Sequence, residues 1–336
     1  MTKLAIVILN WNGQKYLAEF LPALVQYAPN YAEVIIADNA STDNSIAFLK
    51  THFPSVRIIQ NKENGGFSKG YNDALKQVEA EYYCLLNSDV AVTENWIEPI
   101  IKMLDNDPQV AVVQPKLLSY DNHKNFEYAG ACGGFIDYLG YPFCRGRFFE
   151  HLEEDLAQYD DAMEVFWATG AALFVRSSIY HKMNGLDEDF FAHMEEIDFC
   201  WRVKSSGYKI MVEHKSVVYH VGGGTLPKNN SRKTYLNFRN NWFLLLKNLP
   251  KRKMLMVFLL RYPLDHIAAL FFLAQGHFKD TWAVYRAQLS CLRQFFKIKR
   301  KREKINEEVY RQTFQKSIVF QHYIKRKRKF DGKNLL

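Results

Sequence analysis

The chain of 336 residues contains few cysteines, and their spacing is not that of a metal or redox site. Its five cysteines are scattered, and no C-x-x-C pair occurs. This pattern argues against zinc chemistry or a disulfide framework and favours a reducing, cytosolic compartment. The apolar run near the N-terminus is short and lacks a small-residue cleavage site, so we expect no export signal.

The sequence also lacks the common nucleotide-binding fingerprints. It has no Walker A loop, and no G-x-G-x-x-G motif follows its first apolar run. The second absence argues against a nicotinamide-dependent dehydrogenase. Internal repeats and Gly/Ser-rich linkers are missing as well.

Acidic residues are scarce in the last quarter of the chain. Residues 245–336 hold 22 Lys and Arg against 6 Asp and Glu, whereas residues 1–244 hold 22 against 30. The net charge of +8 therefore combines an acidic body with a strongly basic, aromatic-rich tail. Such asymmetry predicts an anionic partner for the tail, either a membrane surface or nucleic acid.

Short apolar runs alternate with amphipathic stretches through the first 114 residues. We expect strands at residues 3–9, 33–37, 56–60, 82–86 and 110–114, and helices at residues 14–27, 45–52, 68–79 and 96–104. This alternation predicts an α/β fold with a doubly wound, mainly parallel sheet flanked by helices. Residues 115–165 are irregular and predict an insertion over the sheet.

Polar segments follow the expected strands at their carboxyl ends, which is where open α/β sheets bind ligands. Asn10 and Asn12 follow the first strand, Asp38 ends the second, and Asn87, Ser88 and Asp89 follow the fourth. A carboxylate such as Asp38 accepts hydrogen bonds from a base or a ribose. The alternative is that the segment only caps the helix beginning near residue 45.

A glycine-rich turn runs from Asn64 through Gly66 and Gly70 to Asn72 and leads into a helix. Glycine permits close backbone approach, and a helix N-terminus favours anions, so this turn predicts a phosphate site.

Asp89 and His220 predict a site for a hard divalent cation, Mg²⁺ or Mn²⁺. His220 ends an apolar run and precedes three glycines, which would let the following loop close over a ligand. The alternative for His220 is a hydrogen-bonded structural histidine.

Three carboxylates, Glu195, Glu196 and Asp198, crowd together after two phenylalanines. Mutual repulsion and burial raise carboxyl pKa values and can tune one group into a general base. Acids at the positive end of a helix dipole explain the same pattern equally well.

Seven motifs together resemble family 2 glycosyltransferases of the GT-A fold, in particular the rhamnosyltransferase-like enzymes of bacterial surface polysaccharide synthesis. In chain order they read VILNWNG, DNASTDNS, NGGFSKGYN, LLNSDV, ATGAALFVR, GLDEDFFAHMEEIDFCWR and HVGGGT. The resemblance covers roughly residues 3–245 and implies a GT-A catalytic domain over residues 1–245.

The resemblance implies a role for each motif. The donor-binding residues would be Leu9, Asn10, Asn12, Asp38, Asn64, Gly66, Gly70, Asn72, Asn87 and Ser88. The metal ligands would be Asp89, in the position of the family's D-x-D aspartate, and His220. The motif here reads Asn-Ser-Asp, without the first acid. Glu196 stands where the family has its general base, with Glu195 and Asp198 as the other candidates, and residues 168–171 would flank the acceptor.

These roles imply a metal-dependent, inverting transfer from a nucleotide-diphosphate sugar, with a dTDP- or UDP-linked donor. A carboxylate removes the proton of the acceptor hydroxyl as that oxygen attacks the anomeric carbon, and the nucleotide diphosphate leaves from the opposite face. The acceptor would be a lipid-linked or growing surface glycan. A second hypothesis is a glycosyltransferase-like scaffold without activity, given Asn87 in place of the first acid.

The tail, residues 246–336, predicts helices that associate with a membrane. Residues 253–274 are long enough to span a bilayer, but Arg261, Pro263, Asp265 and His266 lie at their centre. We therefore expect a helix pair lying on the membrane, with a single span as the alternative. Basic clusters at residues 297–304 and 325–329 suit an anionic cytoplasmic leaflet, which predicts a peripheral protein on the inner face of the plasma membrane. Nucleic-acid binding is disfavoured, because the body is acidic and offers no basic groove.

Overall fold

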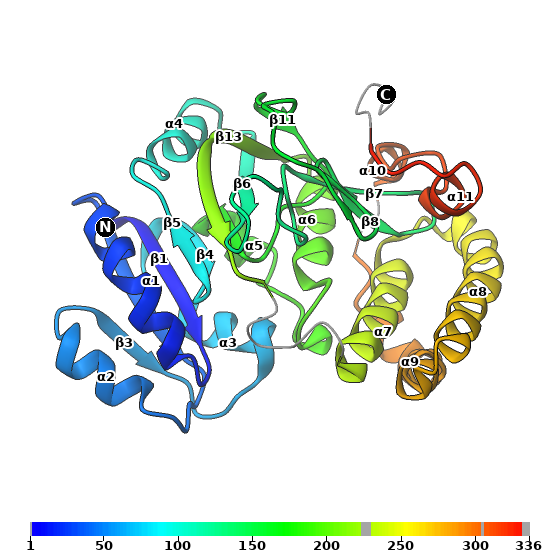
Figure 1. Ribbon diagram of the computed structural model, residues 1–336, viewed down its shortest axis with the longest axis horizontal. Coiled ribbons are helices and arrows are strands. Elements are labelled where there is room, and N and C mark those ends of the chain that lie inside the picture. The colour runs from blue at the N-terminus through cyan, green and yellow to red at the C-terminus, as the bar shows by residue number, and fades with distance from the viewer. Residues whose placement is uncertain (1, 223–229, 304–305, 331–336) are drawn as a thin grey trace.

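The computed structural model describes residues 2–222, 230–303 and 306–330. An α/β body built from the N-terminal two thirds of the chain lies beside a group of C-terminal helices (Figure 1). The glycines at 223 and 224, which we expected to form a closing loop, lie outside the described residues.

One large mixed sheet forms the body. Its strand order is β11-β13-β6-β12-β4-β1-β2-β3, and β5 pairs with β13. The strands are β1 (Thr2–Asn10), β2 (Ala32–Asp38), β3 (Arg57–Gln60), β4 (Ala80–Asn87), β5 (Val90–Val92), β6 (Val110–Ser119), β11 (Met163–Glu164), β12 (Ala172–Arg176) and β13 (Lys209–His220). The four strands β3, β2, β1 and β4 pair in parallel, as the alternating sequence pattern predicts.

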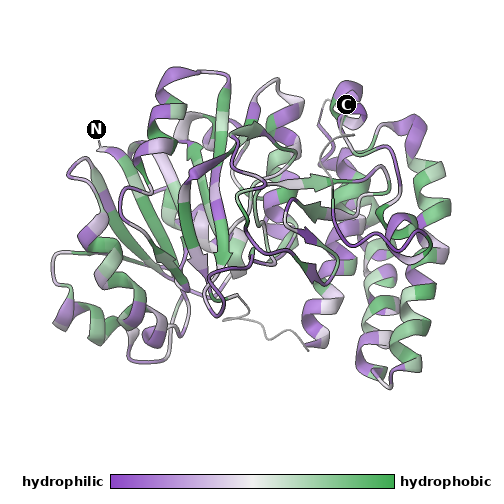
Figure 2. Ribbon diagram, turned by 45° about the horizontal axis from the view of Figure 1, so that its top comes forward, coloured by the Kyte–Doolittle hydropathy of each residue, from purple (hydrophilic) through white to green (hydrophobic). Residues whose placement is uncertain are grey.

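Helices cover both faces of this sheet. They are α1 (Gln14–Tyr27), α2 (Ser45–His52), α3 (Gly66–Leu75), α4 (Glu98–Asn106), α5 (Ser177–Lys182) and α6 (Glu195–Ser205). Alternate residues of β1 separate the two cores: Ile6 and Ile8 pack with α1, α2 and α4, whereas Ala5 and Val7 pack with α3, α5 and α6. Both faces of the sheet are therefore apolar. Its strands are largely hydrophobic along their length (Figure 2). The predicted doubly wound α/β class is confirmed.

The antiparallel strand β12 was not predicted. It lies between β4 and β6 and is antiparallel to both. Beyond it, β6 and β13 pair in parallel, whereas β11 and β5 are antiparallel to β13. The segment 115–165 also differs from the irregular insertion that we expected. It forms a four-stranded antiparallel sheet of β7 (Gly134–Ile136), β8 (Pro142–Cys144), β9 (Arg147–Phe148) and β10 (His151–Leu152).

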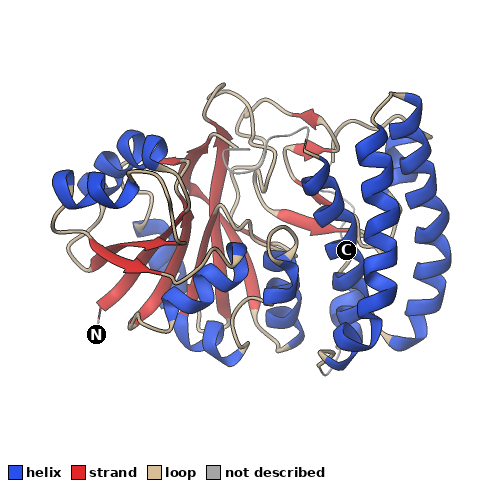
Figure 3. Ribbon diagram, turned by 90° about the horizontal axis from the view of Figure 1, so that it is seen from below, coloured by secondary structure: helices blue, strands red, loops and turns tan. Residues whose placement is uncertain are grey.

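The C-terminal region consists of three long helices and two short ones. They are α7 (Ser231–Asn248), α8 (Lys251–Ala274), α9 (Phe278–Arg300), α10 (Glu307–Arg311) and α11 (Ile318–Tyr323). Figure 3 shows the long helices side by side at one end of the molecule. Phe314 and Phe330 pack against Phe143 of the small sheet, so the end of the chain completes the core of that sheet.

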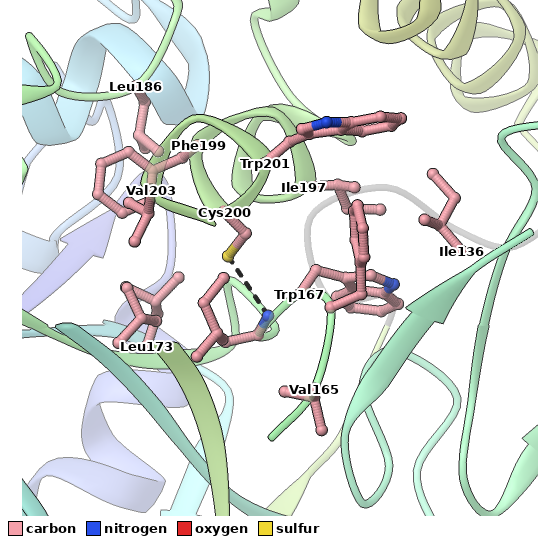
Figure 4. Packing of buried hydrophobic residues seen from close by; sticks show 14 of the residues in the cluster. Ile136, Val165, Trp167, Leu173, Leu186, Ile197, Phe199, Cys200, Trp201 and Val203 are labelled. Carbon is pink, nitrogen blue, oxygen red and sulfur yellow. Dashed lines mark hydrogen bonds between the residues drawn. The ribbon is translucent and has the colours of Figure 1, made fainter. Parts of the chain in front are cut away.

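Helix α6 is fixed in place by its apolar face. Ile197, Cys200 and Trp201 pack with Trp167 in one buried cluster (Figure 4). The Cys200 thiol accepts a hydrogen bond of 3.4 Å from the backbone N–H of Ala168. A rigidly packed α6 gives the carboxylates at its N-terminus a defined position.

Candidate active site

The carboxyl ends of β1 and β2 are joined by side-chain hydrogen bonds. Asn10 donates to Asp38 at 3.0 Å and to the Ser41 hydroxyl at 3.2 Å. Asn12 accepts from the backbone N–H of Thr42 at 2.7 Å. The predicted site residues Asn10, Asn12 and Asp38 therefore lie together, and the buried Oδ1 of Asn10 has no hydrogen-bond partner among the described residues.

The glycine-rich turn packs directly against these strand ends. A Cβ atom at Gly70 would lie 2.8 Å from the Leu9 side chain and 3.1 Å from the amide nitrogen of Asn39, so only glycine fits there. Asn39 also donates to Asn64 at 3.0 Å and to the Gly66 carbonyl at 3.1 Å. Leu9, Asn64, Gly66 and Gly70 thus belong to the same surface as Asn10 and Asp38.

Asn72 does not belong to that surface, which corrects our expectation of a donor contact. Its Oδ1 accepts from the Tyr180 hydroxyl at 2.7 Å and from the backbone N–H of Leu186 at 3.0 Å. Its Nδ2 donates to the Leu186 carbonyl at 2.8 Å and to Glu188 at 3.2 Å. Because both ends of the amide are engaged, Asn72 serves to tie α3 to the segment that precedes α6.

Asp89 and His220 meet at the ends of β4 and β13, as the metal prediction requires. The Nε2 atom of His220 lies 3.1 Å from Asp89 Oδ1. The partly buried Asn87 and Ser88 precede Asp89, and the Ser88 hydroxyl would lie 3.5 Å from a Cβ atom at Gly13. Asn87 and Ser88 therefore lie beside the β1 loop.

Glu127 is a third member of this group that the sequence did not indicate. Its carboxylate lies 3.4 Å from His220 Nδ1 and is buried. Burial alone would lower the pKa of His220, but Glu127 and Asp89 outweigh it and raise that pKa to about 10. A histidine that binds a metal through one nitrogen commonly donates its other N–H to a carboxylate, and Glu127 is placed for that part. These residues fit a divalent cation held by Asp89 and His220 Nε2.

A second group with metal-ligand chemistry, Glu150, His151 and His322, lies elsewhere. The ligand atoms of these three residues fall within 4.8 Å of one another. They come from the small sheet and α11, not from the carboxyl ends of the large sheet. Glu150 is 67% exposed, so this group does not belong to the strand-end site.

Glu195 and Glu196 begin α6, and both carry one buried carboxylate oxygen without a hydrogen-bond partner among the described residues. Burial raises the pKa of Glu196 to about 7. Burial and the neighbouring charge of Glu196 also raise the pKa of Glu195. A carboxylate with a pKa near neutrality is suited to general-base chemistry.

The surroundings of Glu196 connect it to the acceptor and donor segments that we predicted. A Cβ atom at Gly170 would lie 3.8 Å from Glu196 Cβ and 3.1 Å from the Phe67 ring. Gly170 of the 168–171 segment therefore lies beside both Glu196 and Phe67 of the glycine-rich turn.

Asp198 is the candidate base that the structure disfavours. It is fully buried, and its carboxylate accepts from Arg202 at 2.9 Å, Lys247 at 2.8 Å and Asn248 at 2.8 Å. Burial would raise the pKa of Asp198, but Lys247 and Arg202 lower it below its usual range. A carboxylate held by two cations is a poor proton acceptor, so Asp198 is an anchor for α7.

The C-terminal helices expose a large apolar surface. The exposed side chains include Leu255, Leu259, Ile267, Leu270 and Phe271 on α8, and Phe278, Trp282, Leu289, Leu292 and Phe296 on α9. Helix α8 is long and apolar enough to cross a membrane, and 22% of its apolar window is buried. Length and composition alone are weak evidence for a span.

Arg261 and Asp265 do not interrupt the exposed face of α8, contrary to our expectation of charges at the centre of an apolar segment. Both are buried, and they form an ion pair of 3.2 Å. Asp265 also accepts from the Trp242 indole at 2.8 Å. These charges hold α8 to α7 and leave the outward face apolar.

Part of the basic tail likewise faces the protein. Lys297 lies 2.5 Å from Asp189, and Lys301 lies 2.5 Å from Asp187. Lys297 and Lys301 of the predicted basic cluster therefore dock the end of α9 against the segment before α6 in addition to carrying charge.

Comparison with known proteins agrees with this geometry. Residues 5–161 match the family described as "Glycosyl transferase family 2". This chain carries a family 2 glycosyltransferase domain. The N-acetylglucosaminyl-diphospho-decaprenol L-rhamnosyltransferase of Mycobacterium tuberculosis is 24% identical over 66% of this chain and 77% of its own length. The low-salt glycan biosynthesis hexosyltransferase Agl10 of Haloferax volcanii is 21% identical over 71% of this chain and 74% of its own length.

Solved structures share the fold of this family 2 protein. GalNAc-T7 with UDP, GalNAc and Mn²⁺ superposes with a TM-score of 0.58 at 12% identity, covering 75% of this chain and 49% of that one. The Pyrobaculum calidifontis mannosyltransferase PcManGT, in complex with GDP-Man and Mn²⁺, superposes with a TM-score of 0.52 at 14% identity. The match covers 89% of this chain and 84% of that one. The predicted GT-A fold is confirmed.

Proposed function

We propose that this family 2 glycosyltransferase moves a sugar, with inversion, from a nucleotide-diphosphate sugar to a hydroxyl of a lipid-linked or growing surface glycan. The single observation that carries the proposal is the placement of Glu196. A carboxylate with a raised pKa lies beside Gly170 of the 168–171 segment, and Gly170 in turn lies beside Phe67 of the glycine-rich turn that packs on the predicted nucleotide-binding strand ends.

The relatives support the acceptor class. One is named as a rhamnosyltransferase acting on N-acetylglucosaminyl-diphospho-decaprenol, and another as a hexosyltransferase of glycan biosynthesis. By analogy, a hexose or deoxyhexose is transferred to an acceptor carried on a lipid. We keep a dTDP- or UDP-sugar as the donor; the superposed structures contain UDP or GDP-Man.

The donor is bound along the strand ends. Asp38 and Asn10 contact the nucleoside, and the backbone around Gly66 and Gly70 approaches the ribose and phosphates. Asp89 and His220 would hold Mg²⁺ or Mn²⁺, and Glu127, 3.4 Å from His220 Nδ1, would orient the imidazole. When bound, the cation supplies positive charge that stabilises the departing diphosphate.

Glu196 removes the proton of the acceptor hydroxyl. That hydroxyl oxygen attacks the anomeric carbon, and the bond from this carbon to the diphosphate oxygen breaks on the opposite side. One in-line displacement inverts the anomeric centre. Burial and the neighbouring Glu196 raise the pKa of Glu195 as well, which favours the neutral form of Glu195 beside a charged Glu196.

The C-terminal region brings the enzyme to its acceptor. We propose a catalytic domain over residues 1–245 and a membrane-associating region over residues 246–336. The exposed apolar side chains of α8 and α9 enter the interface, and the outward-facing lysines and arginines attract anionic lipids. This arrangement supports the proposal of a peripheral enzyme on the cytoplasmic face of the plasma membrane.

A thermal-shift screen followed by a transfer assay tests this function. UDP, dTDP and GDP are compared with and without Mn²⁺, because a bound ligand stabilises the folded protein by mass action. We expect one nucleotide diphosphate to raise the melting temperature in a metal-dependent way, and its sugar conjugate to be consumed with a lipid-linked acceptor. Stabilisation without any transfer or hydrolysis would favour an inactive scaffold instead.

A further inference from the structure

The segment between η1 (Glu188–Phe190) and α6 has an unusual backbone. Phe191, His193 and Met194 have φ values of 66°, 71° and 71°, in the left-handed region that non-glycine residues rarely adopt. Met194 is the N-cap of α6, and its side chain makes no capping hydrogen bond. The start of α6, where Glu195 and Glu196 lie, is therefore held by something other than its own cap.

The carbonyl groups of this segment point to two different helices. The Phe191 carbonyl accepts from the backbone N–H groups of Phe67 at 2.7 Å and Ser68 at 3.3 Å, at the N-terminus of α3. The carbonyls of Phe190, Ala192 and His193 accept from one side chain, the amide of Asn240 on α7, at 2.9, 2.8 and 2.7 Å. Hydrogen bonds therefore link this segment to the glycine-rich turn on one side and to α7 on the other.

Asn240 is suited to this task by burial and chemistry. It is fully buried, and its Oδ1 accepts from Arg239 Nε at 2.9 Å, so the amide is held in one orientation. Arg239 adds hydrogen bonds to the carbonyls of Asp189 at 3.0 Å and Phe190 at 2.9 Å. No other described side chain donates to the carbonyls of Ala192 and His193.

We infer that Asn240 is a positioning residue that holds Glu196 at the reacting position through the backbone of residues 190–193. This inference rests on the proposed role of Glu196 as the base. Asn240 does not touch the substrate; it sets the position and burial of a group that does. The position of the catalytic carboxylate thereby depends on α7, through a residue that lies 44 positions further along the chain.

The alternative is that Asn240 only helps α7 to dock. Asn241 offers a matched control, since it is the next residue on α7 and is also buried. Its amide donates to the Gly140 carbonyl at 2.6 Å, and its Oδ1 accepts from Arg261. Asn241 therefore docks α7 against the small-sheet region and α8 without touching residues 190–193.

The test compares Asn240→Leu with Asn241→Leu by two measurements. Leucine is close to asparagine in size, donates no hydrogen bond and adds no charge. First, an infrared difference titration against Glu196→Gln reports protonation of the Glu196 carboxyl without any need for activity. Second, the transfer rate is divided by the fraction of enzyme that binds nucleotide diphosphate.

We expect wild type to titrate near the value of about 7 given by burial of Glu196. Asn240→Leu should lower the midpoint by about one pH unit, because the released segment admits water to the carboxylate. Its normalised kcat should fall about 10- to 100-fold with an unchanged donor KM, as expected of a misplaced base. Asn241→Leu should leave the midpoint and the normalised kcat close to wild type, and Asn240→Gln should recover part of both.

Equal midpoints in Asn240→Leu and Asn241→Leu would overturn the inference and leave Asn240 a docking residue. If Asn240→Leu does not fold, Arg239→Gln replaces it in the test, because this change removes only partly buried hydrogen bonds. Arg239→Gln should shift the midpoint of the Glu196 titration in the same direction by a smaller amount. No shift would overturn the inference. Failure of the proposed function is a separate result, namely full transfer activity in Glu196→Gln.

Discussion

His220 Nε2 lies 3.1 Å from Asp89 Oδ1, although 131 residues separate them in the chain. The two side chains meet because β13 pairs with β5 directly after β4, which places the end of β13 beside the Asn87-Ser88-Asp89 turn. The carboxylate of Glu127 completes the arrangement on the other side of the imidazole.

This arrangement predicts that Asp89→Ala and His220→Ala weaken metal-dependent nucleotide binding. Each variant removes one of the two side chains that would hold the cation. Calorimetry with the nucleotide diphosphate and Mn²⁺ should show a loss of at least about tenfold in affinity, typical of a lost metal contact. Glu127→Gln should have a smaller effect in the same direction.

His151→Ala is the matched control for those variants, because it removes an imidazole from the separate group with Glu150 and His322. Its nucleotide affinity should equal that of wild type. The metal assignment would be wrong if His151→Ala lost affinity while Asp89→Ala and His220→Ala kept it.

The raised pKa of Glu196 predicts the pH dependence of transfer. The base acts only when deprotonated, so activity is present above a pKa of about 7 and is lost as pH falls below it. In that range kcat/KM should fall about tenfold per pH unit. A midpoint near 4.5, the ordinary value for a glutamate, would show that burial does not tune this group.

The buried cation of Lys247 should matter for stability. It lies 2.6 Å from Asp187 and 2.8 Å from Asp198, and all three groups are almost inaccessible to water. Lys247→Met leaves buried carboxylates without their main partner, so unfolding in urea should show a loss of about 3–5 kcal/mol.

The same ion pairs predict acid sensitivity. Burial opposes ionisation of Asp187 and Asp198, but Lys247, together with Lys301 at Asp187 and Arg202 at Asp198, outweighs burial and lowers both pKa values. Their stabilisation is therefore present above the ordinary carboxyl pKa of about 4 and is lost as pH falls below it. The stability difference between wild type and Lys247→Met should shrink in that acid range. A difference independent of pH would contradict the ion-pair explanation.

Membrane binding is best tested by point substitutions, because deleting the tail would also remove Phe314 and Phe330 from the core of the small sheet. Leu292 and Phe296 are 73% and 72% exposed on α9. Changing both to Ser should reduce co-sedimentation with phosphatidylglycerol vesicles about tenfold, through the lost apolar burial. The control variant carries Val25→Ser and Leu156→Ser, two exposed positions on the α/β body, and should bind the vesicles as wild type does. Equal vesicle binding by the two double variants would reject the interfacial surface.

The first half of the fold could be predicted from the sequence because its signals are local. Apolar runs and amphipathic spacing located β1 to β4 and α1 to α4, and ligand sites at parallel strand ends follow from topology. Strand β12 could not be located in that way, since it enters the sheet between β4 and β6 from a distant part of the chain.

The position of Asp38, Asp89 and His220 at strand ends could be predicted from the sequence, and their roles in binding stay predictions. The site was not predicted where long-range contacts decide the role of a residue. Asn72 accepts hydrogen bonds from Tyr180 and Leu186. Asp198 accepts one from Lys247, which lies 49 residues away in the chain. Glu127 and Asn240 lie in segments without a local motif, so only the folded chain shows their neighbours.

The central claim is that Glu196 is the base, and the most direct test is the transfer rate of Glu196→Gln under saturating donor. The amide keeps the size of the carboxylate but cannot accept the proton, so the rate should fall about 100- to 10,000-fold while nucleotide binding stays intact. Glu195→Gln and Asp198→Asn are the controls and should retain more activity per folded molecule. If Glu196→Gln transfers sugar at nearly the wild-type rate while Glu195→Gln or Asp198→Asn is the slowest, the base has been assigned to the wrong carboxylate.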